Sequence, residues 1–351
     1  MKPNTHTSSP DTVYFGKDIP ITLSTRIILQ TAEKLGVEWK EIPGTKMFSL
    51  THEGVVKIFT DQMSPDTNFI GWLACNDKVA AKAFLQQSGI SVAKGAVIYS
   101  GYSDEDVQNV LSTISFPVVV KPTNGKHGKD VFVNIKNTEE MKTAIKKILD
   151  GSEASLDGVL IENMFTGHEY RILATREKVI GIINRVPANV VGDGTNTIQQ
   201  LIDLKNADPR RGDGYDKALL KIKVDSVVTS YLAQQQMNLD FVPASGMQVF
   251  LRENSNLSTG GDSIDFTDKA HPSVAEVALR AINAIPGLAF AGIDFMTPDI
   301  YAPQTENSYI IVEINASPML SMHDFPYEGK SRMAADSFIY SVFPELSNNK
   351  L

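Results

Sequence analysis

The chain has 351 residues, 42% of them hydrophobic and 21% charged, a composition typical of globular domains rather than of disordered or fibrous proteins. The formal net charge of -8 creates no overall positive field, so nucleic acid is not expected as a partner. A single cysteine, Cys75, excludes an internal disulfide framework and a zinc site built on several cysteines.

The polar segment 1–11 lacks the basic and then apolar order of a signal peptide. No stretch of the chain approaches the roughly 18 consecutive apolar residues that a membrane span requires. The sequence therefore predicts a cytoplasmic protein without a membrane partner.

Residues 21–36 carry apolar side chains at helical spacing and end at Gly36, which predicts a helix. Apolar runs at 48–50 and 55–59 flank a short polar turn and predict a hairpin. We therefore expect residues 1–70 to form a small N-terminal α/β lobe. A second helix is predicted over 77–88, begun by Asp77.

The rest of the chain is expected to form two α+β lobes, at 71–160 and 161–351. The first holds strands at 116–121, 131–134 and 158–162 and a helix at 138–149. The second holds strands at 168–175, 178–187, 247–252, 289–296 and 309–315, and helices at 197–205 and 215–237.

Lys121 ends an apolar strand and precedes a loop that contains Gly125 and Gly128. A fixed cation beside a flexible loop, whose N–H groups can approach phosphate oxygens, suits a nucleotide triphosphate. The spacing fits neither a Walker A loop nor a dinucleotide fingerprint. The alternative is a hairpin turn with solvated lysines.

A second segment runs from the apolar strand at 159–161 through Glu162 and Asn163 to Glu169. The strand end can offer backbone groups to an adenine edge, and a carboxylate beyond it can accept hydrogen bonds from both ribose hydroxyls. Glu169 is the ribose candidate. The alternative is that both glutamates are solvated strand-end residues.

Two very apolar strands are interrupted by Asp294, Glu313 and Asn315. Burying carboxylates is costly without a neighbouring cation. Because side chains alternate along a strand, Glu313 and Asn315 share a face, and Asp294 can complete an oxygen-only site of the kind that Mg²⁺ prefers. A salt bridge to a core lysine or arginine is the alternative.

The segments 185–194, 256–263 and 313–318 (RVPANVVGDG, NLSTGGDS and EINASP) resemble the ATP-grasp carboxylate–amine ligases. They are similar to the ATP-grasp module of cyanophycin synthetase and to the glutathione synthetase module of bifunctional glutamate–cysteine ligase/glutathione synthetase. The resemblance covers roughly residues 70–345 and implies an ATP-grasp fold, in which two α+β lobes clasp ATP.

The resemblance also implies roles for individual residues. ATP phosphates would be bound by lysines, the adenine would be flanked by Glu162 and Asn163, and Glu169 would bind the ribose. Two Mg²⁺ ions, with Mn²⁺ as a substitute, would be held by the three oxygen-bearing residues named above. The phosphate-binding lysines would be Lys121 together with Lys78 or Lys82.

The reaction implied is phosphoryl transfer from ATP to a carboxylate, followed by attack of an amine on the acyl phosphate. Arg185 and Arg252 are candidates for contacting the acyl phosphate or a substrate carboxylate, and each could equally be a core arginine paired with the acidic cluster. His323 is a weaker candidate for facing the substrate, and a hydrogen-bonded structural histidine is the commoner outcome.

The substrates implied are amino acids or short peptides, and a homo-oligomer is compatible with the resemblance. The short chain favours a stand-alone ligase that acts once or on an existing peptide. Two other classes stay open, namely a nucleotide-binding regulatory protein without turnover and a phosphotransferase that needs no amine.

Overall fold

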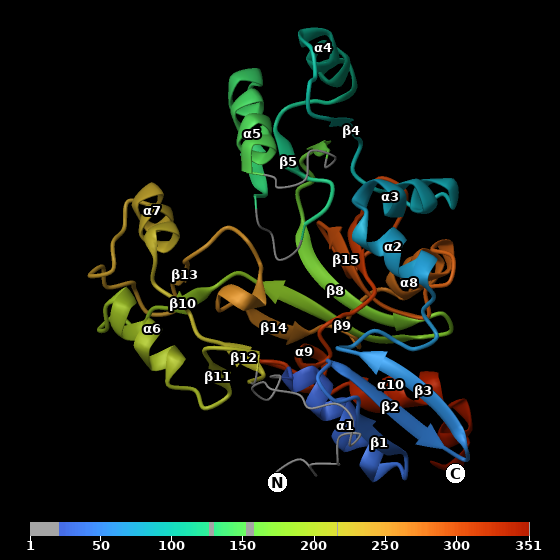
Figure 1. The fold of residues 1–351 in the computed structure, drawn as a ribbon. Helices are drawn as coiled ribbons and strands as arrows, with labels where there is room; N and C mark the ends of the chain where they lie inside the picture. Colours follow the sequence, from blue (N-terminus) through green and yellow to red (C-terminus); the bar gives the residue numbers. More distant parts are fainter. Residues whose placement is uncertain (1–20, 126–129, 152–157, 216, 351) are drawn as a thin grey trace.

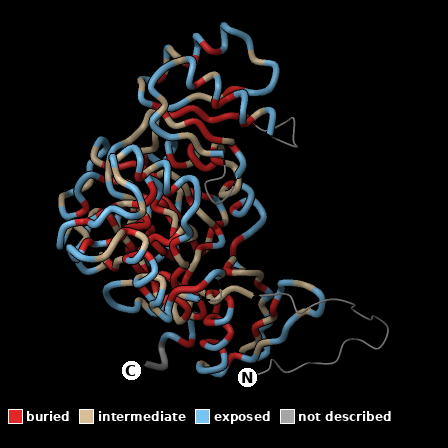
Figure 2. Tube along the Cα trace, turned by 90° about the vertical axis from the view of Figure 1, so that its left-hand side faces the viewer, coloured by how far each residue is buried: buried red, intermediate tan, exposed pale blue. Residues whose placement is uncertain are grey.

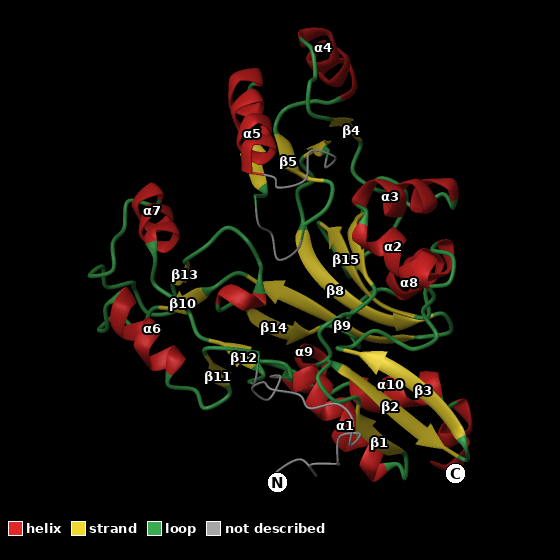
Figure 3. Cartoon of the chain, viewed as in Figure 1, coloured by secondary structure: helices red, strands yellow, loops and turns green. Residues whose placement is uncertain are grey.

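The computed structural model describes residues 21–125, 130–151, 158–215 and 217–350, and its helices and strands are mixed along the chain (Figure 3). Gly128 and His127 of the predicted phosphate loop lie outside the described residues. No helix in the described ranges is long and apolar enough to cross a membrane.

The N-terminal segment contains helix α1 (Leu23–Lys34) and the antiparallel strands β1 (Glu38–Glu41), β2 (Met47–His52) and β3 (Val55–Thr60). The predicted helix and hairpin are therefore present, and β1 was not predicted. Helix α10 (Ala334–Val342) packs beside α1 and supplies Phe338 to the same core (Figure 1). The boundary at residue 70 stays a prediction, because distant parts of the chain build this core together.

Helices α2 (Phe69–Asn76) and α3 (Lys78–Gln87) follow, and both contact strand β16 (Ile310–Asn315) of the largest sheet. The predicted cap of α3 is present, because Asp77 Oδ1 accepts hydrogen bonds from the backbone N–H groups of Val79 at 2.8 Å and Ala80 at 3.1 Å. Helix α2 was not predicted.

A four-stranded antiparallel sheet has the order β4 (Gly95–Ile98), β7 (Val159–Asn163), β5 (Val118–Pro122) and β6 (Phe132–Ile135). Its core is closed by α4 (Asp104–Thr113) and α5 (Thr138–Gly151), whose apolar stripes bury Val107, Val110, Met141 and Ile145. The predicted strands and the helix over 138–149 are confirmed, while α4 and β4 are additions.

A five-stranded antiparallel sheet has the order β14 (Asp262–Asp265), β9 (Val179–Val186), β8 (His168–Thr175), β15 (Phe290–Thr297) and β16. Helix α8 (Pro272–Ala284) packs on it, and its Val274, Ala278 and Ile282 are buried. Figure 2 shows the buried chain running through this central unit. The strands predicted at 168–175, 178–187, 289–296 and 309–315 are confirmed.

An insertion between β9 and β14 holds β10 (Asn189–Val191), α6 (Ile198–Asn206), β11 (Arg211–Gly212), β12 (Leu219–Leu220), α7 (Ser226–Gln234), β13 (Gln248–Phe250) and the 3₁₀ helix η1 (Leu257–Thr259). The helix predicted over 215–237 is wrong in extent, because residues 219–220 pair with β11 and Asp225 caps α7. The chain ends in α9 (Ser321–Asp324), α10 and η2 (Pro344–Lys350).

Candidate functional site

An open cleft of about 2080 Å³ is lined by residues of both the four-stranded and the five-stranded sheets and by helix α7. Almost all of the described residues that the sequence singled out line it, namely Lys78, Lys121, Gly125, Glu162, Asn163, Glu169, Arg185, Arg252, Asp294, Glu313 and Asn315. Lys82 does not line the cleft and reaches it through Glu162.

Glu162 on β7 forms ion pairs with two lysines and is only 3% exposed. Its Oε1 lies 2.6 Å from Lys82 Nζ, and its Oε2 lies 2.6 Å from Lys121 Nζ. Burial alone would raise the pKa of Glu162, but the two ammonium groups outweigh burial and the pKa is lowered. The carboxylate is thus engaged by lysines, and contact of Glu162 with adenine stays a prediction.

Lys78, the first residue of α3, points along the glycine-bearing loop. Its Nζ donates to the carbonyl of Gly125 at 3.0 Å, and its backbone N–H donates to the carbonyl of Thr123 at 3.3 Å. Burial lowers the pKa of Lys78, and the negative charge of Glu313 opposes this shift. Lys78 and Lys121 therefore bring two cations to the same wall of the cleft as the loop.

The segment predicted to hold the nucleoside lies between the two sheets. Apolar side chains of both sheets line the cleft here and provide a surface suited to a flat ring, namely Val119, Met164, Phe165, Met296, Ile310 and Val312. Asn163 Oδ1 accepts a hydrogen bond from the backbone N–H of Ser115 at 2.8 Å, and contact of Asn163 with adenine stays a prediction. Glu169 contacts the hydroxyl of Ser255 and the guanidinium of Arg185.

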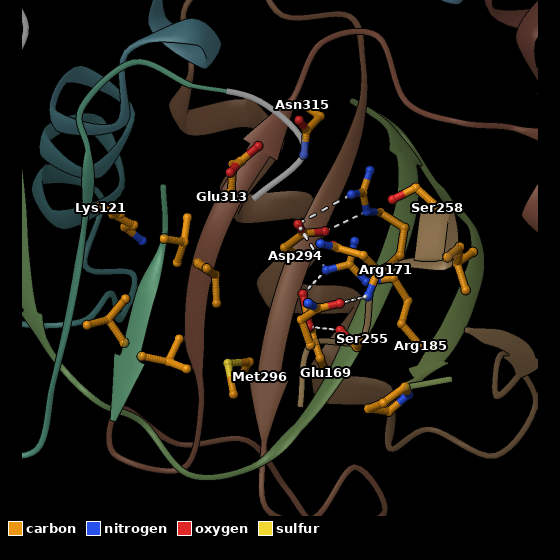
Figure 4. A pocket seen from close by; sticks show the side chains of 18 of the residues that line it. Lys121, Glu169, Arg171, Arg185, Ser255, Ser258, Asp294, Met296, Glu313 and Asn315 are labelled. Atoms are coloured by element: carbon orange, nitrogen blue, oxygen red, sulfur yellow. Dashed lines mark hydrogen bonds and ion pairs between the residues drawn. The ribbon is translucent and has the colours of Figure 1, made fainter. Parts of the chain in front are cut away.

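The predicted metal ligands meet on two neighbouring strands (Figure 4). Asp294 on β15 and Glu313 on β16 are paired across the ladder, and Asn315 is paired with Gly292. Asn315 Nδ2 is buried without a hydrogen-bond partner among the described residues, so no described protein group holds the amide through its nitrogen. Two carboxylates and a side-chain amide give a hard, oxygen-rich donor set that fits Mg²⁺.

No group of three His, Cys, Asp or Glu side chains in the described part of the chain could hold a metal ion. The role of Asn315 as a third ligand beside Asp294 and Glu313 stays a prediction.

Asp294 is engaged by two arginines from adjacent strands. Arg171 Nε lies 2.5 Å from its Oδ1, and Arg171 Nη2 and Arg185 Nη2 each lie 3.3 Å from its Oδ2. Arg171 on β8 is the ladder partner of Asp294. The arginine fits because Gly292 has no side chain: a Cβ there would lie 2.8 Å from Arg171 Nη1.

Sequence reasoning assigned no role to Arg171. Glu169 and Arg171 are two residues apart on an apolar strand, and this spacing places both on the same face. That pattern could have indicated a second polar residue in the site. Arg185 forms ion pairs with Glu169 and Asp294. Pairing with the acidic cluster was one of the two alternatives that the sequence left open for this arginine.

Arg252 has partners in the insertion instead of in the cluster around Asp294. Its Nη2 donates to Asp225 Oδ2 at 2.7 Å and to the carbonyl of Lys223 at 3.1 Å. It still lines the cleft, so contact with substrate stays a prediction.

Two other side chains near the cleft, those of His323 and Cys75, are given no role in the reaction. His323 is fully buried and is not among the residues that line the cleft, and burial together with the charge of Arg171 lowers its pKa to about 3. Cys75 borders the cleft, but burial raises the pKa of its thiol to about 12, so it is protonated at neutral pH.

Residues 75–194 match the RimK-like ATP-grasp domain. Cyanophycin synthetase of Trichormus variabilis is 34% identical over 336 residues, which cover 95% of this chain and 36% of that protein. The glutathione biosynthesis bifunctional protein of Clostridium perfringens is 36% identical over 327 residues, which cover 92% of this chain and 41% of that protein.

The structure of a bifunctional glutathione synthetase from Pasteurella multocida superimposes with a TM-score of 0.72 at 32% identity, covering 93% of this chain and 44% of that chain. The chain therefore spans less than half the length of these relatives. It has the ATP-grasp fold, and the predicted fold class and resemblance are confirmed.

Proposed function

From the ATP-grasp fold, we propose that this chain is an ATP- and Mg²⁺-dependent ligase that joins the carboxylate of an amino acid or short peptide to an amine through an acyl phosphate. One observation carries the proposal: the lysines of α3 and of the four-stranded sheet line one cleft together with the candidate metal ligands of the five-stranded sheet. Phosphoryl transfer requires these two features together.

The residues divide into three groups along the cleft. Lys78 and Lys121 would neutralise phosphate oxygens, and Glu169 would accept hydrogen bonds from the ribose. Mg²⁺ would be held by Asp294, Glu313 and Asn315, where it would neutralise charge on the transferred phosphoryl group.

The chemistry balances in two steps. A carboxylate oxygen of the substrate attacks the γ-phosphorus, and the bond from that phosphorus to the β–γ bridging oxygen breaks, which releases ADP. The amine nitrogen then attacks the acyl carbon, phosphate leaves, and the amine loses a proton. Arg185 lies beside Asp294 and is suited to stabilising the oxyanion of the second step.

The size of the cleft is consistent with this reaction. Single-ligand pockets usually measure about 300–1,000 Å³, and the open cleft here is about 2080 Å³. It has room for a nucleotide together with a carboxylate and an amine substrate.

The experiment is ADP release with ATP and Mg²⁺ across a matrix of carboxylates and amines, including γ-glutamylcysteine, single amino acids and glycine, with mass detection. We expect release to require one pair of substrates and a product lighter than their sum by one water. Glu313→Gln should slow release on the order of 10³-fold, because it removes a charged metal ligand. Glu306→Gln, an exposed acid on the loop before β16, is the matched control.

Two outcomes would contradict the proposal. ADP release that needs no amine would identify a phosphotransferase. Tight ATP binding with no release for any pair would favour a nucleotide-binding regulatory protein.

A further inference from the structure

The candidate metal ligands differ in the ion pairs that they form with other side chains. Among the described residues, Asp294 forms ion pairs with Arg171 and Arg185, and no ion pair to Glu313 is present. In Figure 4 both guanidinium groups lie on one side of Asp294, and Glu313 lies on the other.

The charges on that side balance. Asp294 and Glu169 supply two negative charges, and Arg171 and Arg185 supply two positive charges. Each arginine is only 9% exposed, so water screens their charges weakly. A divalent cation that arrives alone at Asp294 meets a cluster that is already neutral, in which the two guanidinium groups offset the attraction of the two carboxylates.

The two arginines are held differently. Arg171 contacts Asp294 through two nitrogens, at 2.5 Å and 3.3 Å, and lies over Gly292, where there is no side chain. Arg185 contacts Asp294 through one nitrogen at 3.3 Å, and the same Nη2 contacts Glu169. Because its one contact with Asp294 is the longer one, Arg185 is the arginine that can leave Asp294 at lower cost.

We propose that Arg185 is a counter-ion of Asp294 that opposes binding of a divalent metal until nucleotide arrives. This inference rests on the proposed function, because it takes Asp294 as a metal ligand and Glu169 as the ribose contact. Ribose hydroxyls on Glu169 and metal at Asp294 remove both partners of Arg185 at once. The triphosphate supplies the negative charge that keeps the cleft neutral.

Release of Arg185 has a consequence for the order of binding. The freed guanidinium remains beside the place where a phosphoryl group is transferred, and it can then pair with a substrate carboxylate. Before the nucleotide binds, Arg185 is occupied by Glu169 and Asp294 and is not available to a substrate carboxylate.

The test measures Mn²⁺ binding to the full chain by electron paramagnetic resonance, first without nucleotide. Arg185→Met keeps the length of the side chain but leaves the cluster with one excess negative charge. We expect Mn²⁺ to bind this variant about tenfold more tightly than wild type, or better, from the Coulomb energy of one removed charge. Adding Asp294→Asn to Arg185→Met should abolish the gain.

Arg252→Met is the matched control, because Arg252 is also a buried arginine that lines the cleft but pairs with Asp225. It should leave Mn²⁺ affinity at the wild-type value. Circular dichroism of each variant checks that the fold is retained.

The outcomes separate the inference from the proposed function. If Arg185→Met binds Mn²⁺ alone no more tightly than wild type, the counter-ion role is wrong, whatever the enzyme does with ATP. If wild type with a non-hydrolysable ATP analogue binds Mn²⁺ and Asp294→Asn binds it equally well, Asp294 is not a metal ligand. The proposed metal site and the inference then fail together.

Discussion

Each of the two sheets that line the cleft buries a carboxylate between two cations, but the cations differ. In the four-stranded sheet Glu162 lies between Lys82 and Lys121, and in the five-stranded sheet Asp294 lies between Arg171 and Arg185. A buried lysine can lose its proton, whereas an arginine stays charged in proteins. Raising the pH can therefore remove positive charge beside Glu162, at Lys82, whose pKa is lowered by burial, whereas the two arginines beside Asp294 stay charged.

The largest expected effect comes from removing the buried carboxylate of the lysine pair. Glu162→Gln leaves Lys82 and Lys121 buried without a counter-charge, and this should lower the free energy of unfolding by about 3–5 kcal/mol at neutral pH. Urea unfolding measures the loss. Asp294→Asn, which removes the other buried carboxylate, is the variant for comparison. A loss below about 1 kcal/mol for Glu162→Gln would mean that the pair behaves as a surface pair.

The pH dependence of that loss sharpens the comparison. Burial lowers the pKa of Lys82 below the ordinary value of 10.5, even with Glu162 present. Between the lowered pKa and 10.5 the unfolded state binds more protons, so stability rises with pH. Glu162 partly opposes this lowering, so without it the pKa of Lys82 falls further and the stability of Glu162→Gln rises with pH over a wider range than that of wild type. The deficit of Glu162→Gln should therefore shrink as pH rises toward 10.5, while that of Asp294→Asn stays constant. Parallel pH curves for the two variants would contradict the distinction.

The second effect concerns His323, which is buried on the five-stranded side near Arg171. Burial and the charge of Arg171 lower the pKa of His323 from 6.5 to about 3, so the unfolded state alone takes up a proton between these values. Stability is therefore lost as pH falls from 6.5 toward 3, by roughly 3 kcal/mol at pH 4.5. His323→Gln should lose that much less between pH 7 and pH 4.5 in urea unfolding. If His323→Gln loses as much stability as wild type between pH 7 and pH 4.5, His323 is protonated in the folded state.

Sequence reasoning succeeded where a residue's partners are local. Alternation along a strand places Glu313 and Asn315 on one face, and Lys121 lies at the end of its apolar strand, directly before the loop. Asp77 caps the helix that immediately follows it. In each case neighbouring positions in the chain determine the geometry.

It failed where the partners are distant or a competing local structure intervenes. The pairing of Arg171 with Asp294 depends on the register of β8 against β15, which joins residues 123 positions apart. The N-terminal core is completed by α10, from the other end of the chain. The overlong helix prediction at 215–237 failed because Asp225 offers its carboxylate to the N–H groups of Val227 and Val228 and starts the helix late.

A third prediction tests the packing that holds Arg171 on Asp294. A Cβ at Gly292 would lie 2.7 Å from Pro318 Cβ and 2.8 Å from Arg171 Nη1. Gly292→Ala should therefore displace the guanidinium and destabilise the fold by about 1–3 kcal/mol in thermal or urea unfolding. Gly151→Ala is the control, because a Cβ there meets nothing within 4 Å. If Gly292→Ala unfolds like wild type, the arginine has another position of equal energy.

The smallest expected effect concerns Ser255, whose hydroxyl donates to Glu169 Oε2 while Arg185 contacts Oε1. Ser255→Ala removes one hydrogen bond to a charged group, worth about 1 kcal/mol, so ATP affinity should fall about fivefold. Because Glu169 is proposed to hold the ribose, the loss should be smaller for a nucleotide without the 2′ and 3′ hydroxyls. Ser258→Ala, which also alters a serine lining the cleft, controls for the loss of a hydroxyl there. Calorimetric titration with both nucleotides decides the point: an equal loss for both would mean that Ser255 acts through Arg185 and Asp294, on the metal side, and that Glu169 does not bind the ribose.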